Sequence, residues 1–206
     1  MKKLICLALC ILLAFSLTSC GGKADEEGPA KELVTAYMQY IKDFDLDGIT
    51  NITASSDFRY MNEKFAILPE ETMQQVKTWS HDIEFEIGDV SIDDLNATVN
   101  VNVKYCDATA AMTAASEVYY DEVERVVASS GLGGMRSDDA KLKKKINEFL
   151  AKCINDAIET EGLGKTEKTI PVELVKYQGE WKIKNLSIDM FNVLTSNAFI
   201  LSQEEQ

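Results

Sequence analysis

Hydrophobic residues in the N-terminal part of the chain recur every three or four positions, which is the spacing of one buried helix face. Gly28-Pro29 predicts the start of a first helix, with proline at the first helical position, and this helix runs to about Phe44. Its buried face consists of Leu33, Val34, Tyr37, Met38 and Ile41. A shorter helix is expected over residues 45–54, and Pro69 with the two acids after it predicts a third helix.

From Ile83 the spacing of apolar residues changes to two, which indicates strands with one buried and one polar face. The clearest strand runs from Leu95 to Tyr105, where apolar residues alternate with polar ones. Alternation over residues 170–174, followed by Gln178-Gly179, predicts a β-hairpin. Both the long strand and the first helix must bury a stripe, so we expect them to pack together. The strand residues expected in this contact are Leu95, Val99, Val101 and Val103.

Residues 108–161 return to helical spacing and predict a helical hairpin inserted between two strand regions. Acids near the end of its first helix and lysines near the start of its second predict ion pairs across the hairpin. A docking patch for an anionic partner is the alternative interpretation of the lysines. Residues 190–201 predict a final helix. The expected fold class is α+β, with a curved antiparallel sheet of about four strands packed on the N-terminal helices.

The start of the chain has the layout of an export signal, because Lys2 and Lys3 precede an apolar run over residues 4–15. That run is shorter than the roughly 20 residues that span a bilayer. Directly after it, Leu17-Thr18-Ser19-Cys20 resembles the lipobox of bacterial lipoproteins, in which the cysteine is linked to diacylglycerol and becomes the new N-terminus. We therefore expect lipid attachment at Cys20 and a location on the extracytoplasmic side of a bacterial envelope. The expected organisation is a signal peptide over 1–19, a flexible lipidated tether over 20–28, a single domain over 29–201 and a tail over 202–206.

Charge and composition restrict the partners of this domain. The chain has 206 residues, with 21 basic and 34 acidic side chains. Removal of residues 1–19 takes away Lys2, Lys3 and no acid, which leaves 19 basic side chains against 34 acidic ones and a formal charge of −15. That charge argues against nucleic acid as a partner. A hydrophobic content of 46% supports a packed globular domain.

The sequence assigns no catalytic residue and predicts no metal or other cofactor. His81, Cys106 and Cys153 are the only histidine and cysteines of the expected domain, and they are too scattered for a zinc site. The segment 43–48 fits the first half of a calcium loop, but Ala54 stands where that loop needs a bidentate carboxylate. An ordinary turn between two helices is therefore expected at this segment.

The order of elements, and the final hairpin with Gly179, Trp181 and Ile183, resemble the nuclear-transport-factor-like, or cystatin-like, fold. The chain is similar in particular to small bacterial lipoproteins built on that fold, over roughly residues 30–107 and 168–200. This resemblance implies a curved sheet that wraps a long helix into a cone. The helical hairpin departs from the minimal fold, and the fold hosts enzymes and binding modules alike.

Two functions follow from this resemblance. The first is a binding module that holds a small apolar molecule, a peptide or an envelope protein, with the lipid on Cys20 as its contact to the membrane. The second is an isomerase- or dehydratase-like enzyme that acts on a small apolar substrate in the cone. The residues expected to line a ligand site are Tyr37, Val101, Tyr105 and Trp181. A carboxylate hydrogen-bonded to a tyrosine in a deep cavity would favour the enzyme.

Overall fold

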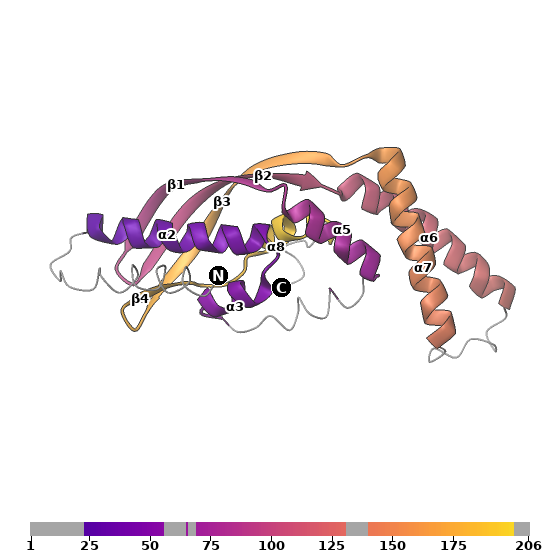
Figure 1. Ribbon diagram of the computed structural model, residues 1–206, viewed down its shortest axis with the longest axis horizontal. Helices are drawn as coiled ribbons and strands as arrows, with labels where there is room; N and C mark the ends of the chain where they lie inside the picture. Colours follow the sequence, from indigo (N-terminus) through magenta and orange to yellow (C-terminus); the bar gives the residue numbers. More distant parts are fainter. Residues whose placement is uncertain (1–22, 56–64, 66–68, 131–139, 200–206) are drawn as a thin grey trace, which may run out of the picture.

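The computed structural model describes residues 23–55, 65, 69–130 and 140–199, which form an α+β fold (Figure 1). The helices are α2 (Lys23–Lys42), α3 (Leu46–Ile52), α5 (Glu70–Ser80), α6 (Thr109–Ser130), α7 (Ala140–Glu161) and α8 (Ile188–Leu194). The strands are β1 (Glu84–Asp93), β2 (Asn96–Asp107), β3 (Gly164–Tyr177) and β4 (Glu180–Ile183). The expected fold class is confirmed, because N-terminal helices precede a four-stranded antiparallel sheet and the hairpin α6–α7 is inserted between β2 and β3.

The sheet has the order β1-β2-β3-β4, and each strand pairs antiparallel with the next. Along β2 the odd-numbered residues from Ala97 to Tyr105 are buried, whereas Asn100, Asn102 and Lys104 are exposed. The predicted turn between β3 and β4 is confirmed at Gln178 and Gly179, whose φ angles of 54° and 89° suit a tight hairpin. The sheet therefore buries one face and leaves the other in water.

The predicted contact between the first helix and the long strand is confirmed for all but one residue. One apolar cluster contains the fully buried residues Val34, Tyr37, Met38, Ile41, Val99, Val101 and Val103. Leu95 was expected in this contact and is instead 53% exposed, because it lies in the turn between β1 and β2. The strand before this turn continues past a bulge at residues 88–89.

The first helix begins earlier than predicted, and Pro29 lies inside α2 rather than at its start. A proline removes one helical hydrogen bond, so the turn before it needs support from elsewhere. Glu26 supplies that support, because its carboxylate accepts hydrogen bonds from Lys176 Nζ at 2.6 Å and from Trp181 Nε1 at 3.0 Å. Residues 23–28 are helical in the structure, whereas the sequence predicted a flexible tether over 20–28. The signal peptide and Cys20 lie outside the described residues.

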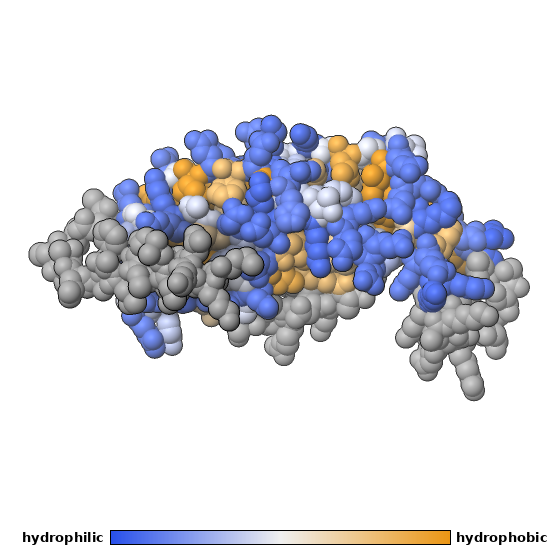
Figure 2. All heavy atoms as spheres, viewed as in Figure 1, coloured by the Kyte–Doolittle hydropathy of each residue, from blue (hydrophilic) through white to orange (hydrophobic). Residues whose placement is uncertain are grey.

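The helical hairpin has a small core of its own. Small residues bring α6 and α7 close together, and the buried set is Ala111, Ala115, Cys153, Ile154 and Ala157. The rings of Tyr119 and Phe149 stack at 6.2 Å between centroids. In the view of Figure 2, hydrophilic residues cover much of the surface over α5 and α7. Within the described part of the chain, no helix combines the length and the apolar character needed to cross a membrane.

The ion pairs of the hairpin differ from those expected. Glu122 pairs with Arg125 on its own helix, and Lys144 pairs with Glu148 at 3.7 Å, also on its own helix. Neighbours three or four positions apart on a helix lie on the same side, so these pairs form without any contact across the hairpin. The expectation of cross-hairpin pairs is wrong for Glu122 and Lys144.

The last helix is shorter than predicted, since α8 covers Ile188–Leu194 and not residues 190–201. Ser196 and Asn197 adopt left-handed φ angles of 53° and 58°, which end the helix. The carbonyl of Ser196 then accepts a hydrogen bond of 2.9 Å from the N–H of Ala108. The chain therefore leaves α8 to meet the start of α6.

Asp107, at the end of β2, connects this strand to α6, to β3 and to the segment after α8. Its carboxylate accepts hydrogen bonds from the N–H and the hydroxyl of Thr109, and from the Thr166 hydroxyl at 2.6 Å. Burial acts to raise the pKa of Asp107, but hydrogen bonds from Thr109, Thr166 and Asn197 outweigh it and lower that pKa to about 2. Asn197 also accepts a long hydrogen bond of 3.5 Å from the Tyr105 hydroxyl. The ionised carboxylate therefore holds the hairpin on the sheet.

We predict that Asp107→Asn lowers the free energy of unfolding at pH 7 by about 1 to 2 kcal/mol. Because the pKa of Asp107 is lower in the folded protein, its contribution is complete above the ordinary aspartate pKa of about 4. That contribution is lost as the pH falls from about 4 towards 2, so the difference between wild type and variant should shrink over this interval. Urea unfolding of both proteins at several pH values measures it.

Glu117→Gln is the matched control, because Glu117 is an exposed carboxylate on α6. This variant should unfold like the wild type at every pH. A difference between wild type and Asp107→Asn that stays constant from pH 7 to pH 2 would contradict the role of the ionised carboxylate.

Candidate functional site

A groove opens at the edge of the sheet because β4 is much shorter than β3. β4 pairs with residues 174–177 of β3, and the last contact beyond it is the hydrogen bond of 2.8 Å from Lys184 N–H to the Glu173 carbonyl. The chain then leaves the sheet and enters α8, where the Ser187 hydroxyl accepts from the N–H of Met190 at 3.2 Å and caps the helix. The edge of β3 before Glu173 therefore faces the segment 185–190 across an open space.

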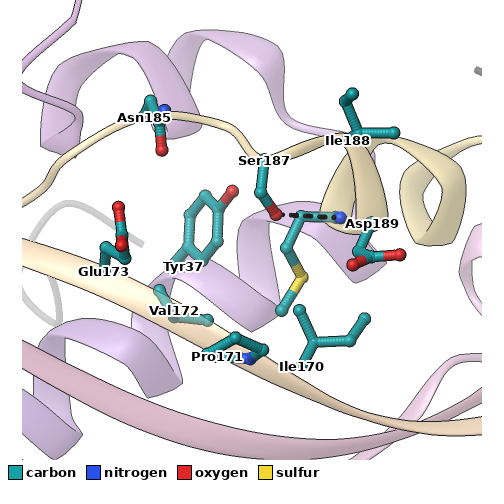
Figure 3. Close-up of a pocket in the computed structure, with 10 residues that line it drawn as sticks. Tyr37, Ile170, Pro171, Val172, Glu173, Asn185, Ser187, Ile188 and Asp189 are labelled. Carbon is teal, nitrogen blue, oxygen red and sulfur yellow. Dashed lines mark hydrogen bonds between the residues drawn. The ribbon is translucent and has the colours of Figure 1, made fainter. Parts of the chain in front are cut away.

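The groove has a volume of about 370 Å³, which is within the range of sites for small molecules. Its apolar wall comes from β3 and from the start of α8, and its polar rim comes from the connecting segment (Figure 3). The lining residues are Tyr37, Ile170, Pro171, Val172, Glu173, Asn185, Ser187, Ile188, Asp189 and Met190.

Tyr37 lies at the floor of this groove and has an unpaired hydroxyl. Its side chain is fully buried, and Tyr37 Oη has no hydrogen-bond partner among the residues that the structure describes. In Figure 3 the ring lies among the lining residues, and its hydroxyl points towards the segment that carries Asn185 and Ser187. A buried hydroxyl without a partner costs about 1 to 3 kcal/mol. Burial raises the pKa of Tyr37 far above its ordinary value, so the phenol stays protonated and can donate a hydrogen bond.

The two acids of the groove are each paired with a lysine at its rim. Glu173 pairs with Lys184 at 3.1 Å, and Asp189 pairs with Lys168 at 3.6 Å. All four side chains are about half exposed, so the pairs are screened and contribute little to stability. The opposite charges of these pairs nearly cancel at the rim. Neither carboxylate accepts a hydrogen bond from the Tyr37 hydroxyl. The arrangement therefore suits an uncharged polar group of a ligand better than acid–base chemistry.

Two other residues expected at a ligand site have structural contacts instead. Val101 is fully buried in the main core, and it does not line the groove. Trp181 packs on the hairpin, where its Nε1 donates to Glu26 and the Lys176 ammonium lies 5.3 Å from its ring centroid. Tyr37, Val101 and Trp181 all belong to the main apolar cluster, and of these three Tyr37 lines the groove.

Tyr105, the fourth candidate, lines a different pocket of about 400 Å³ at the other end of the strands. The remaining lining residues are Lys42, His81, Asp82, Glu84, Lys104, Cys106 and Lys165. Several of these polar groups are already paired, since Lys42 Nζ donates to the Ile83 carbonyl at 2.8 Å and Lys104 lies 3.9 Å from Glu84. Burial raises the pKa of the Cys106 thiol, and the nearby charge of Asp82 raises it further. None of the residues that line this pocket has a buried polar side-chain atom without a partner in the described structure, whereas Tyr37 in the groove has one.

The segment that fits half of a calcium loop has a structural role. Asp45 caps α3 by accepting a hydrogen bond of 2.8 Å from the N–H of Gly48. A Cβ at Gly48 would lie 2.5 Å from the ring of Tyr40, so this position requires glycine for packing. The described residues contain no group of three or more histidine, cysteine or acidic side chains placed to hold a metal ion.

Of the residues that line the groove, Tyr37 was among the sequence candidates and the others were not. The early end of β4 brings together Glu173, Asn185 and Ser187. The point at which β4 stops pairing with β3 is not marked by any periodic pattern in the sequence. Two signals were present. Pro171 lies within the alternating part of β3, and proline within a sheet is typical of an edge strand. Ser187 followed by Asp189 has the pattern of a helix start, which limits the length of β4.

Comparisons with known proteins establish no family for this chain. No family model matches it, and no curated protein matches it. A solved structure that it resembles is described as a "putative lipoprotein (ycdA)" from Bacillus subtilis, with 16% sequence identity and a TM-score of 0.44. The match covers 84% of this chain, which spans 56% of the length of that protein. A likeness at this level establishes neither a shared fold nor a shared function, so the nuclear-transport-factor-like fold stays a prediction.

Proposed function

We propose that this protein is a lipid-anchored component of a bacterial envelope whose domain binds a small, partly apolar molecule in the groove at Tyr37. The anchor is the diacylglycerol on Cys20, and the domain lies on the extracytoplasmic side of the membrane. The groove would hold a molecule with an apolar body and an uncharged oxygen or nitrogen that accepts a hydrogen bond. A nuclear-transport-factor-like fold would fit this role, because that fold hosts binding modules.

The sequence at the N-terminus supports the anchor. Leu17-Thr18-Ser19-Cys20 follows the apolar run directly, which is the position of a lipobox. Two or three acyl chains give stable attachment, whereas one chain gives only marginal binding. The negative charge of the domain provides no electrostatic attraction to an anionic bilayer, so the lipid would carry the attachment.

The unpaired hydroxyl of Tyr37 is the observation that supports ligand binding most strongly. Buried polar groups in folded proteins are nearly always paired, and exceptions often mark a functional site. Tyr37 Oη is itself buried in the free protein, so a ligand acceptor that displaces a neighbouring side chain and reaches this oxygen would supply the missing hydrogen bond. Part of the binding energy would then come from relief of a cost that the free protein carries.

The chemistry of the walls defines the class of molecule. Ile170, Val172 and Met190 offer apolar contacts, whereas Asn185 and Ser187 add polar groups on the side towards which the Tyr37 hydroxyl points. The acids of the rim are paired with lysines, so a charged ligand would have to compete with Lys168 or Lys184 for its partner. A neutral molecule avoids this competition.

We predict that Tyr37→Phe leaves the free protein as stable as the wild type or more stable. The change keeps the buried ring and removes a hydroxyl that has no partner. Urea unfolding measures the effect, and Tyr40→Phe on the same helix is the matched control. A loss of more than about 1 kcal/mol in Tyr37→Phe would show that the hydroxyl has a partner within the protein.

Two probes of similar shape test whether this hydroxyl recognises an acceptor. Acetophenone has a carbonyl oxygen on a phenyl ring, and isopropylbenzene has nearly the same shape without the oxygen. NMR titration of each probe gives a dissociation constant from the shifts of residues 170–173 and 185–190. We predict that Tyr37→Phe weakens the binding of acetophenone relative to that of isopropylbenzene by about 5- to 10-fold.

Tyr40→Phe should leave the ratio of the two dissociation constants unchanged, because Tyr40 does not line the groove. An equal ratio in wild type and Tyr37→Phe would contradict the proposed role of the hydroxyl. Shifts confined to residues outside the groove would contradict the proposed site.

A further inference from the structure

Two large apolar side chains are exposed together at the end of the sheet where both β-turns lie. Leu95, in the turn between β1 and β2, is 53% exposed, and Tyr177, at the end of β3, is 61% exposed. The turns are neighbours, because the N–H of Lys176 donates to the Leu95 carbonyl at 2.8 Å. Single exposed apolar residues are common on soluble proteins, but here each of two adjoining turns carries one. We call the two turns, residues 93–96 and 176–180, the turn end.

The first turn of α2 is fixed at this same end. The Glu26 carboxylate binds Lys176 and Trp181, which lie immediately before and after the turn between β3 and β4. The hydrogen bond from Lys176 lowers the pKa of Glu26, which keeps this carboxylate charged. In Figure 1 the start of α2 and both turns lie at one end of the molecule, and the hairpin α6–α7 lies at the opposite end.

The chain length before α2 limits how far the turn end can lie from the lipid. Cys20 precedes Lys23, the first residue of α2, by three positions. A chain spans at most about 3.6 Å per residue, so Lys23 lies within about 11 Å of Cys20. The anchor would therefore hold the turn end against the bilayer surface and not at the end of a long tether. This step rests on the lipid attachment of the proposed function.

We propose that the turn end rests on the bilayer, with Leu95 and Tyr177 in the interfacial region beside the acylated Cys20. Tyrosine is enriched at membrane interfaces, where its ring contacts the acyl region and its hydroxyl stays in water. Lys176 is held by Glu26, and Lys182 donates to the Asn51 carbonyl at 3.3 Å, so the apolar side chains and the lipid on Cys20 would carry the contact.

The acidic side chains of the turn end determine which charge of lipid headgroup it can contact. Asp93, Asp94 and Glu180 are exposed there, whereas the two turns contain one lysine, Lys176. An anionic surface would repel these acids, so the contact is expected with zwitterionic headgroups and is shallow. Docking in this way fixes the orientation of the domain, and it directs α6 and α7 away from the membrane. Each of these helices has 22 residues and is about 33 Å long.

Spin labels on the acylated, full-length protein in phosphatidylcholine vesicles test the docking. One variant is Leu95→Cys, and the control is Tyr120→Cys, at an exposed position on α6. Cys106 and Cys153 are free but buried, so the protein without an added cysteine reports background labelling. We expect the label at position 95 to lose accessibility to an aqueous nickel reagent several-fold and to gain accessibility to oxygen. The label at position 120 should remain accessible to nickel.

The outcomes separate failure of docking from failure of the anchor. Vesicle flotation tests the anchor, and Cys20→Ser should abolish it. If the protein floats but the label at position 95 is as accessible to nickel as that at position 120, the docking is wrong and the anchor stands. If the wild type does not float, both proposals fail. Protection of position 95 in Cys20→Ser without vesicles, or protection that rises with protein concentration, would assign the surface to a second copy and overturn membrane docking.

Discussion

The structure depends on the burial of one face of the sheet by the apolar side of α2. Val99, Val101 and Val103 alternate with exposed polar residues, so β2 can be stable only if a helix covers its apolar side. The fully buried side chains of α2 provide this cover in the same cluster. Full burial of such side chains contributes about 1.5 to 3 kcal/mol each, which makes this contact the main source of stability. The other elements either complete the cover, as α8 does, or extend from the ends of the strands.

The groove is a consequence of how the chain completes that cover. After four residues of β4 the chain must leave the sheet, so that α8 can place Met190, Phe191 and Leu194 in the core. The departure leaves the edge of β3 without a neighbouring strand in the described part of the chain, and it leaves Tyr37 beneath an opening. The same helix face that stabilises the sheet therefore supplies the floor of the candidate site. The Tyr37 ring contributes to packing, whereas its buried hydroxyl has no hydrogen-bond partner within the described part of the chain.

Periodicity in the sequence was sufficient to predict the elements that are stabilised by their own faces. The alternation along β2 and the glycine turn before β4 are local signals, and both were confirmed. The errors arise where a distant residue decides the local structure. Glu26 extends α2 through Pro29 because Lys176 and Trp181 bind it from the other end of the chain. The groove was only partly predictable for the same reason, because Glu173 and Ser187 meet through the end of a strand pairing.

We infer that the Tyr37 hydroxyl, which has no partner within the described part of the chain, binds a ligand. A crystal structure of the protein purified from the membranes of its own host, without exchange of bound molecules, tests this inference. Ligand binding at Tyr37 predicts density larger than water in the groove, with an oxygen or nitrogen about 2.7 to 3.0 Å from Tyr37 Oη. An ordered water alone on this hydroxyl, or a hydrogen bond from it to another residue of the chain, would contradict ligand binding at Tyr37.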